Sequence, residues 1–141
     1  MPFEHRDHQA DVMLVAWGAT PIEAFESAAQ GLLELMVDTS KVSPATPVAF
    51  TCEADEVSTL LVTFLNEILF VRDQQEMFFC AVSVLEIAEH DGVYTLRGVA
   101  WGEPVDFRRH RVRAEVKPAT YGGLCYRTDN GTHRLECILD V

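Results

Sequence analysis

The stretch DVMLVAWGATPIEAFESAAQGLLELM, residues 11–36, decides the fold. Residues 11–18 are apolar on both alternating faces, which is typical of a strand in the middle of a sheet. The following TPIE, residues 20–23, combines an N-cap threonine, a proline at the first helical position and a glutamate placed for a capping box. The apolar residues after it recur at helical spacing and form one face: Ile22, Phe25, Ala29, Leu32, Leu33 and Met36. The stretch predicts a strand followed by a helix that covers a sheet.

A second amphipathic helix and several strands follow this unit. Asp55 is the predicted cap of the helix, and its apolar stripe consists of Leu60, Leu61, Phe64, Leu65, Ile68 and Val71. Alternation and turn residues predict strands at 48–53, 77–88, 93–101, 111–117 and 134–141, with hairpin turns at 91–92 and 129–131. The sequence therefore predicts an α+β fold, in which two main helices pack on a largely antiparallel β-sheet.

The composition excludes several classes of function. With 48% apolar residues, the 141-residue chain fills one hydrophobic core, so a single domain over residues 1–141 is expected. The formal net charge is −11, which repels phosphate backbones and argues against direct binding of nucleic acid or an anionic membrane. The N-terminus is charged where a signal peptide would be apolar, and no apolar run is long enough to span a bilayer. We expect a cytoplasmic protein.

Carboxylates gather at two places in the sequence. DHQAD, residues 7–11, places Asp7, His8 and Asp11 at the entry of the first strand, and the last strand stops at Asp140 and Val141. If the last strand lies antiparallel to the first, Asp140 and the terminal carboxylate approach Asp11. Three like charges in one volume either raise their pKa values or hold a cation. Oxygen ligands favour Ca²⁺, Mg²⁺ or Mn²⁺ over Zn²⁺, and His8 would shift the preference toward Mn²⁺. The alternative is that both aspartates are solvated turn or terminal residues.

The cations and cysteines offer weaker signals. Lys117 is one of two lysines beside nine arginines, and it is a candidate to neutralise the carboxylates or to contact a phosphate. A solvated lysine on a strand face is the alternative. The basic run at 108–113 is interpreted as an internal ion-pair partner, with a docking patch as the alternative. The four cysteines show no C-x-x-C spacing, and no nucleophile elbow, GxGxxG motif or P-loop is present. The sequence therefore predicts no catalytic residues.

Several motifs, in order and spacing, resemble the archease family along nearly the whole chain. DHQAD at 7–11 is similar to the family's D-H-T-A-D opening, and AWGAT at 16–20 with EAFE at 23–26 to its first helix start. The other matching segments are LMVD at 35–38, LL at 60–61 with FLNE at 64–67, WGE at 101–103, EVK at 115–117 with TY at 120–121, and the final DV at 140–141. The resemblance implies an archease-like domain over residues 1–141.

The resemblance also implies a function. Archeases are protein cofactors of the RtcB-type RNA ligase, which joins RNA ends in tRNA splicing and RNA repair with GTP and Mn²⁺. They promote guanylylation of the ligase histidine and sustain multiple turnover, and they are not enzymes themselves. The alternative role is that of a chaperone-like modulator of RNA-modifying enzymes such as tRNA methyltransferases. A stand-alone metal-dependent phosphoesterase is a third reading, which lacks an identifiable general base.

The resemblance assigns roles to a few residues. Asp11, Asp140 and the carboxylate of Val141 match the family's metal ligands, and Lys117 matches its important lysine. Asp11 and Lys117 are the residues expected to activate the partner. The sequence departs from the family at Gln9, where threonine is usual, and after the lysine, where Pro118-Ala119 replaces Ala-Ile. Pro118 removes a backbone donor, so the sheet pairing after Lys117 is in question.

Overall fold

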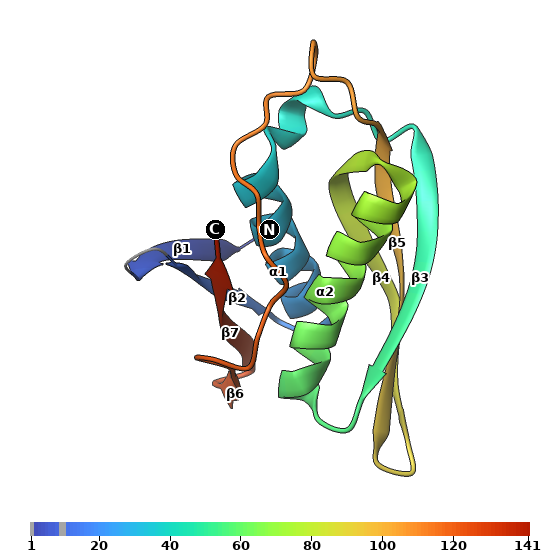
Figure 1. Ribbon diagram of the computed structural model, residues 1–141. Helices are drawn as coiled ribbons and strands as arrows, with labels where there is room; N and C mark the ends of the chain where they lie inside the picture. The colour runs from blue at the N-terminus through green and yellow to red at the C-terminus, as the bar shows by residue number, and fades with distance from the viewer. Residues whose placement is uncertain (1, 9–10) are drawn as a thin grey trace.

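The computed structural model describes residues 2–8 and 11–141, with the side chains of residues 6–8 outside the description. Two antiparallel sheets enclose a layer of two helices (Figure 1). The first sheet has the order β1-β2-β7-β6, and its strands are Phe3–His8, Asp11–Gly18, Thr132–Asp140 and Cys125–Asp129. The second has the order β3-β5-β4, with strands Thr46–Ala54, Val93–Pro104 and Met77–His90. The predicted α+β class is confirmed, and the strands divide between two sheets.

Helix α1, Pro21–Met36, begins as the sequence predicts. The Thr20 hydroxyl accepts a hydrogen bond from the Glu23 N–H at 3.1 Å, and the Glu23 carboxylate accepts from the Ala19 N–H at 2.8 Å. These bonds satisfy two donors near the helix start, and Pro21 needs none. Five of the six predicted face residues are buried, and Ile22 is partly buried. The helix packs on β2 on one side and on β4 on the other.

Helix α2, Val57–Gln75, lies mainly against β3, and its predicted apolar stripe is buried. The prediction that Asp55 caps it is wrong: Glu56 occupies the N-cap position, and no side chain caps the helix. The two helices meet through the Phe25 and Phe64 rings, which pack edge to face with centroids 5.4 Å apart. This contact places the core between the two sheets.

The first sheet confirms the predicted pairing of the first and last segments. Strand β2 lies between β1 and β7, antiparallel to both, so it is the central strand that its apolar faces indicate. Strand β1 was not predicted, because five of its six residues are charged residues or histidines. The hairpin turns also form, with positive φ angles at Asp91, Gly92, Asn130 and Gly131.

The predicted strand at 111–117 is wrong. Its backbone groups bond to the end of α1: the Asp38 N–H donates to the Arg111 carbonyl at 2.9 Å, and the Arg113 N–H donates to the Met36 carbonyl at 2.9 Å. Val112 forms one isolated bridge to Val37 and is exposed, whereas Val116 is buried. The segment 111–113 therefore bonds to the end of α1 and not to a strand of a sheet. A short 3₁₀ turn, η1, covers Thr39–Lys41 directly after the contact residues at the end of α1.

The four cysteines are free thiols, of which Cys52 and Cys137 are buried and Cys80 and Cys125 are partly buried. Burial raises the pKa of Cys52 and of Cys137 to about 12. Among the helices in the described ranges, none is both long and apolar enough to cross a membrane.

Candidate functional site

Asp11 and Asp140 lie directly opposite each other at one end of the first sheet. Asp11 opens β2, Asp140 closes β7, and the register pairs them. Side chains of directly opposite residues point to the same face of a sheet. That face points away from the core, because the neighbouring Leu139 is fully buried while Asp140 is exposed. The antiparallel pairing therefore brings the two predicted carboxylates to one exposed end, as the sequence indicated.

Lys117 lies on the other side of Asp140. Its backbone N–H donates to the Asp140 carbonyl at 3.0 Å, and further along the Ile138 N–H donates to the Gly122 carbonyl at 3.3 Å. The segment 117–122 thus runs beside the part of β7 that β6 does not reach. The backbone contact brings Lys117 next to Asp140, and the role of its side chain beside the carboxylates stays a prediction.

These backbone bonds also define how closely the aspartates approach. The N–H and C=O of a strand residue point to the same side, so the Asp140 backbone is directed to Lys117 and away from β2. Asp11 and Asp140 are then a non-hydrogen-bonded pair, in which the Cα atoms are about 4.5 Å apart and the side chains are closest. Of the two kinds of antiparallel pair, this one brings the carboxylates closest together, so it is the one that best allows both to bind the same cation.

Asn66 on α2 holds the lysine segment in place. Its amide nitrogen donates to the Ala119 carbonyl at 3.1 Å, and its amide oxygen accepts from the Ala119 N–H at 2.6 Å. Val116 and Ala119 are buried on either side of the exposed Lys117. Pro118 interrupts strand pairing as the sequence suggested, and the side-chain amide of a helix supplies the missing backbone partner.

The oxygen-rich donor set suits a hard divalent cation. Asp11 and Asp140 lie opposite each other across β2 and β7, and Val141, whose carboxylate is the third predicted ligand, follows Asp140. Gln9, Ala10 and the side chains of Asp7 and His8 lie outside the described residues. Across the side chains that are described, no group of three or more His, Cys, Asp or Glu residues is gathered for a metal. The metal site at Asp11, Asp140 and Val141 stays a prediction.

A second ionic cluster, centred on Glu103, was only partly expected. Its carboxylate accepts from the His110 Nε2 at 2.9 Å and from the Ser43 N–H at 2.6 Å, and it pairs with Arg109. The His110 Nδ1 accepts from the Asp106 N–H at 3.0 Å, so the ring proton lies on Nε2 and is donated to Glu103. The hydrogen bond from His110, then that from Ser43 and the charge of Arg109, lower the pKa of Glu103.

The prediction that the basic run pairs internally is therefore confirmed for Arg109, and also for Arg113, which pairs with Glu34 at 3.2 Å. The contact of His110, a member of the same run, with Glu103 also agrees with that prediction. The complete burial of its side chain was not predicted, because the sequence does not reveal the path of the loop. The WGE segment at 101–103, which contains Glu103, was the part of the sequence that could have pointed to this cluster. Gly102 permits the β4–β5 contact, since a Cβ there would lie 1.9 Å from the Phe78 carbonyl oxygen.

Known proteins match this chain over nearly all its length. A model of the archease protein family matches residues 3–141. A protein archease from Aeropyrum pernix is 34% identical, covering 97% of this chain and 95% of the relative. One from Pyrococcus furiosus is 35% identical, covering 99% and 98%.

Two solved structures resemble the fold. The solution structure of a Methanobacterium thermoautotrophicum protein superposes with a TM-score of 0.84 at 32% identity, covering 99% of this chain and 98% of the other. The crystal structure of an archease from Thermotoga maritima, described as a possible chaperone, has a TM-score of 0.60 at 14% identity, covering 96% and 94%. The second likeness concerns the fold alone. The sequence matches and the fold agree, and the chain belongs to the archease family.

Proposed function

We propose that this chain activates an RtcB-type RNA ligase in the cytoplasm, where it promotes GTP-dependent guanylylation of the ligase histidine and multiple turnover. The observation that carries the proposal is the register of β2 and β7, which sets Asp11 opposite Asp140. Lys117 joins them through its bond to the Asp140 backbone. Three charged residues from distant parts of the sequence thus meet at one exposed sheet end. The assignment of the chain to the archease family supports the choice of partner.

The carboxylates of Asp11, Asp140 and Val141 would hold Ca²⁺, Mg²⁺ or Mn²⁺, since all three donors are oxygens. A divalent ion held there would supply positive charge to the triphosphate that the ligase histidine attacks. Lys117 presents a compact ammonium group on a segment fixed by two buried neighbours. Its charge is placed to hold a phosphate oxygen or to balance the aspartate pair.

The chain acts as a protein cofactor and leaves the chemistry to its partner. Asp11, Asp140 and Lys117 supply charge and position, and none of them is a nucleophile paired with a base. The RNA stays with the ligase, because a net charge of −11 disfavours an RNA backbone on this chain. The proposal therefore divides the task between an RNA-binding enzyme and an acidic activator.

A guanylylation assay with labelled GTP and the cognate ligase tests this proposal. We expect Asp140→Asn and Lys117→Gln to lose most of the stimulation under multiple turnover, while both proteins stay folded. Asp129→Asn, at the β6–β7 turn, and Lys41→Gln, at the only other lysine, are matched controls that keep it. Wild-type stimulation by the Asp140 and Lys117 variants would show that this sheet end is not the activating site.

The second candidate function is chaperone-like modulation of RNA-modifying enzymes such as tRNA methyltransferases. Large apolar side chains exposed on several elements favour it, among them Phe70, Leu85, Phe107 and Tyr121. A light-scattering assay with an unfolding methyltransferase separates the two candidates. Protection that survives Asp140→Asn, together with no effect on ligase guanylylation, would favour the chaperone role.

A further inference from the structure

We propose that the loop at 104–111 and its adjoining pocket form a docking surface for an acidic segment of a partner protein that carries an apolar side chain. The loop leaves the end of β5 and returns toward the end of α1. It belongs to neither the aspartate pair nor the lysine segment, so the inference does not depend on the proposed activation of a ligase.

The loop is held rigidly. The Arg109 and His110 N–H groups donate to the Asp106 carbonyl at 3.1 and 2.8 Å, and the Arg108 N–H donates to the Asp106 carboxylate at 3.0 Å. The His110 side chain, fully buried, ties the base of the loop to Glu103. Such a loop loses little conformational entropy when a partner binds.

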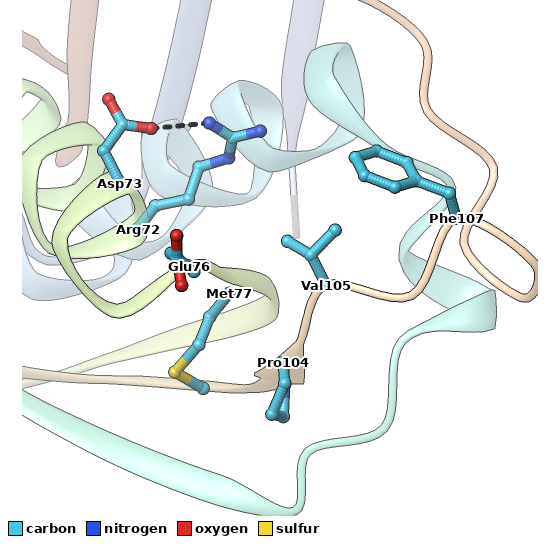
Figure 2. Close-up of a pocket in the computed structure, with 7 residues that line it drawn as sticks. All are labelled: Arg72, Asp73, Glu76, Met77, Pro104, Val105 and Phe107. Carbon is cyan, nitrogen blue, oxygen red and sulfur yellow. Dashed lines mark hydrogen bonds and ion pairs between the residues drawn. The ribbon is translucent and has the colours of Figure 1, made fainter.

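The apex of this rigid loop presents an aromatic ring to solvent. Phe107 is 76% exposed, the highest value among the large apolar side chains in the described part of the chain. Beside it lies a pocket of about 460 Å³ whose apolar wall is formed by Met77, Pro104 and Val105. Figure 2 shows the Phe107 ring and the Arg72 guanidinium directed toward each other above Val105. An apolar side chain of a partner fits between the ring and this wall.

The polar wall of the pocket has donors to spare. The Arg72 guanidinium stacks on the Phe78 ring, with its Cζ 4.9 Å from the ring centre, and its Nη1 donates to Asp73 at 2.7 Å. The Arg72 Nε is enclosed and has no acceptor among the described residues. A guanidinium has five N–H donors in a fork that matches a carboxylate. The enclosed Nε is closed to a partner, so Arg72 offers only its remaining Nη hydrogens to a polar group that enters the pocket.

Arg108 and Arg111 give the loop its excess positive charge. The other two arginines of the basic run, Arg109 and Arg113, pair with Glu103 and Glu34. The side chains of Arg108 and Arg111 are exposed, and neither has an acidic partner within the described residues. On a chain whose net charge is −11, this is a local reversal of sign. Charge complementarity selects an acidic partner.

The pocket rim favours a protein over a nucleic acid. Asp73 and Glu76 lie beside Arg72 and repel a continuous phosphate backbone. A protein segment places its carboxylates at Arg108 and Arg111, which do not line the pocket with Asp73 and Glu76, and keeps an apolar side chain in the pocket. Aromatic and arginine anchors around an apolar pocket are also the usual composition of protein–protein binding centres.

Selection from a library of short random peptides displayed on phage, with the full chain as bait, tests the proposal. We expect enriched peptides to carry Asp or Glu next to an aromatic or large aliphatic residue. A synthetic, fluorescently labelled copy of an enriched peptide should bind about tenfold more weakly to Phe107→Ser and to Arg108→Glu, since each substitution removes one anchor. Its binding should also shift the Nε–Hε signal of Arg72 in a ¹⁵N-correlation spectrum.

Leu85→Ser and Arg97→Glu are the matched controls, because Leu85 is 57% exposed and Arg97 is exposed on the second sheet. Thermal unfolding of each variant checks its folding. The proposal is overturned if no peptide is enriched, if enriched peptides lack acidic residues, or if controls and loop variants weaken binding equally. It is also overturned if a labelled single-stranded oligouridine binds to the loop and loses affinity in the Phe107 and Arg108 variants.

Discussion

Two carboxylates of this protein lie in opposite surroundings. Glu103 is buried, and His110, Arg109 and the Ser43 N–H meet its oxygens. Asp140 is exposed at the end of β7, with the like-charged Asp11 directly opposite. The buried cluster is internally balanced, and its effect is to fix a loop. The exposed pair opposes two like charges, an arrangement that a bound cation would stabilise. The partners of Glu103 fix a loop, whereas Asp11 and Asp140 bring two like charges opposite each other at an exposed sheet end.

The largest expected effect comes from breaking the balanced cluster. His110→Ala should lower the free energy of unfolding by about 3 kcal/mol, because it removes one of the three partners of the buried Glu103 carboxylate, leaves the Asp106 N–H without an acceptor and opens a cavity. Urea denaturation measures the change. His90→Ala, at an exposed histidine, should leave stability unchanged. An equally stable His110 variant would mean that the loop is not held by this cluster.

Adding a divalent cation should stabilise the protein through the exposed Asp11–Asp140 pair. At about 100 times its Kd, Ca²⁺ or Mn²⁺ bound only to the folded state raises the free energy of unfolding by about 2.7 kcal/mol. The rise in Tm should largely vanish in Asp140→Asn and persist in Asp129→Asn. Equal stabilisation of all three proteins would reveal diffuse screening of the net negative charge in place of a site.

A smaller effect is expected from acid, because it involves a single carboxyl group. The pKa of Glu103 in the folded state lies below its usual value near 4.5. Its contribution to stability is therefore fully present above that usual value and is lost as the pH falls through the folded-state pKa. Denaturation midpoints measured across this acidic range should fall more steeply for the wild type than for Glu103→Gln. Parallel profiles would contradict the pairing.

The smallest effect is expected at the aspartate pair itself. Without divalent ions and at low salt, Asp140→Asn should raise the free energy of unfolding by about 0.5 kcal/mol, because it removes a like charge from a directly opposite position. Added salt should erase the gain. Urea denaturation at two salt concentrations measures both, and a destabilised variant would show that Asp140 serves the fold.

The local elements of the fold were predictable because their signals are local. The capping residues at 20–23 and the periodicity of α1 act within a few turns, and the apolar faces of β2 identified a central strand. Strand β1 escaped prediction because its partner β2 imposes it on a charged segment. The segment at 111–117 alternates like a strand, yet its backbone partners belong to the end of α1.

The candidate site divides in the same way. The meeting of Asp11 and Asp140 follows once two strands are assumed to be antiparallel, so the sequence located it. The Glu103–His110 contact depends on the path of an irregular loop, and Asn66 reaches Ala119 from a helix far away in the chain. Neither contact leaves a periodic pattern, so neither was predictable.

The two hydrogen bonds between the Asn66 side chain and the Ala119 backbone hold the lysine segment in a different way from a strand in a sheet. A strand is released only when a ladder of backbone bonds opens, whereas here one side chain carries both bonds at Ala119. Asn66→Ala would remove both of these bonds and let the backbone around Lys117 move more, while every strand pairing stays intact. The mobility of the lysine segment is thus adjustable at one helical position, while the bond from the Lys117 N–H to the Asp140 carbonyl stays in place.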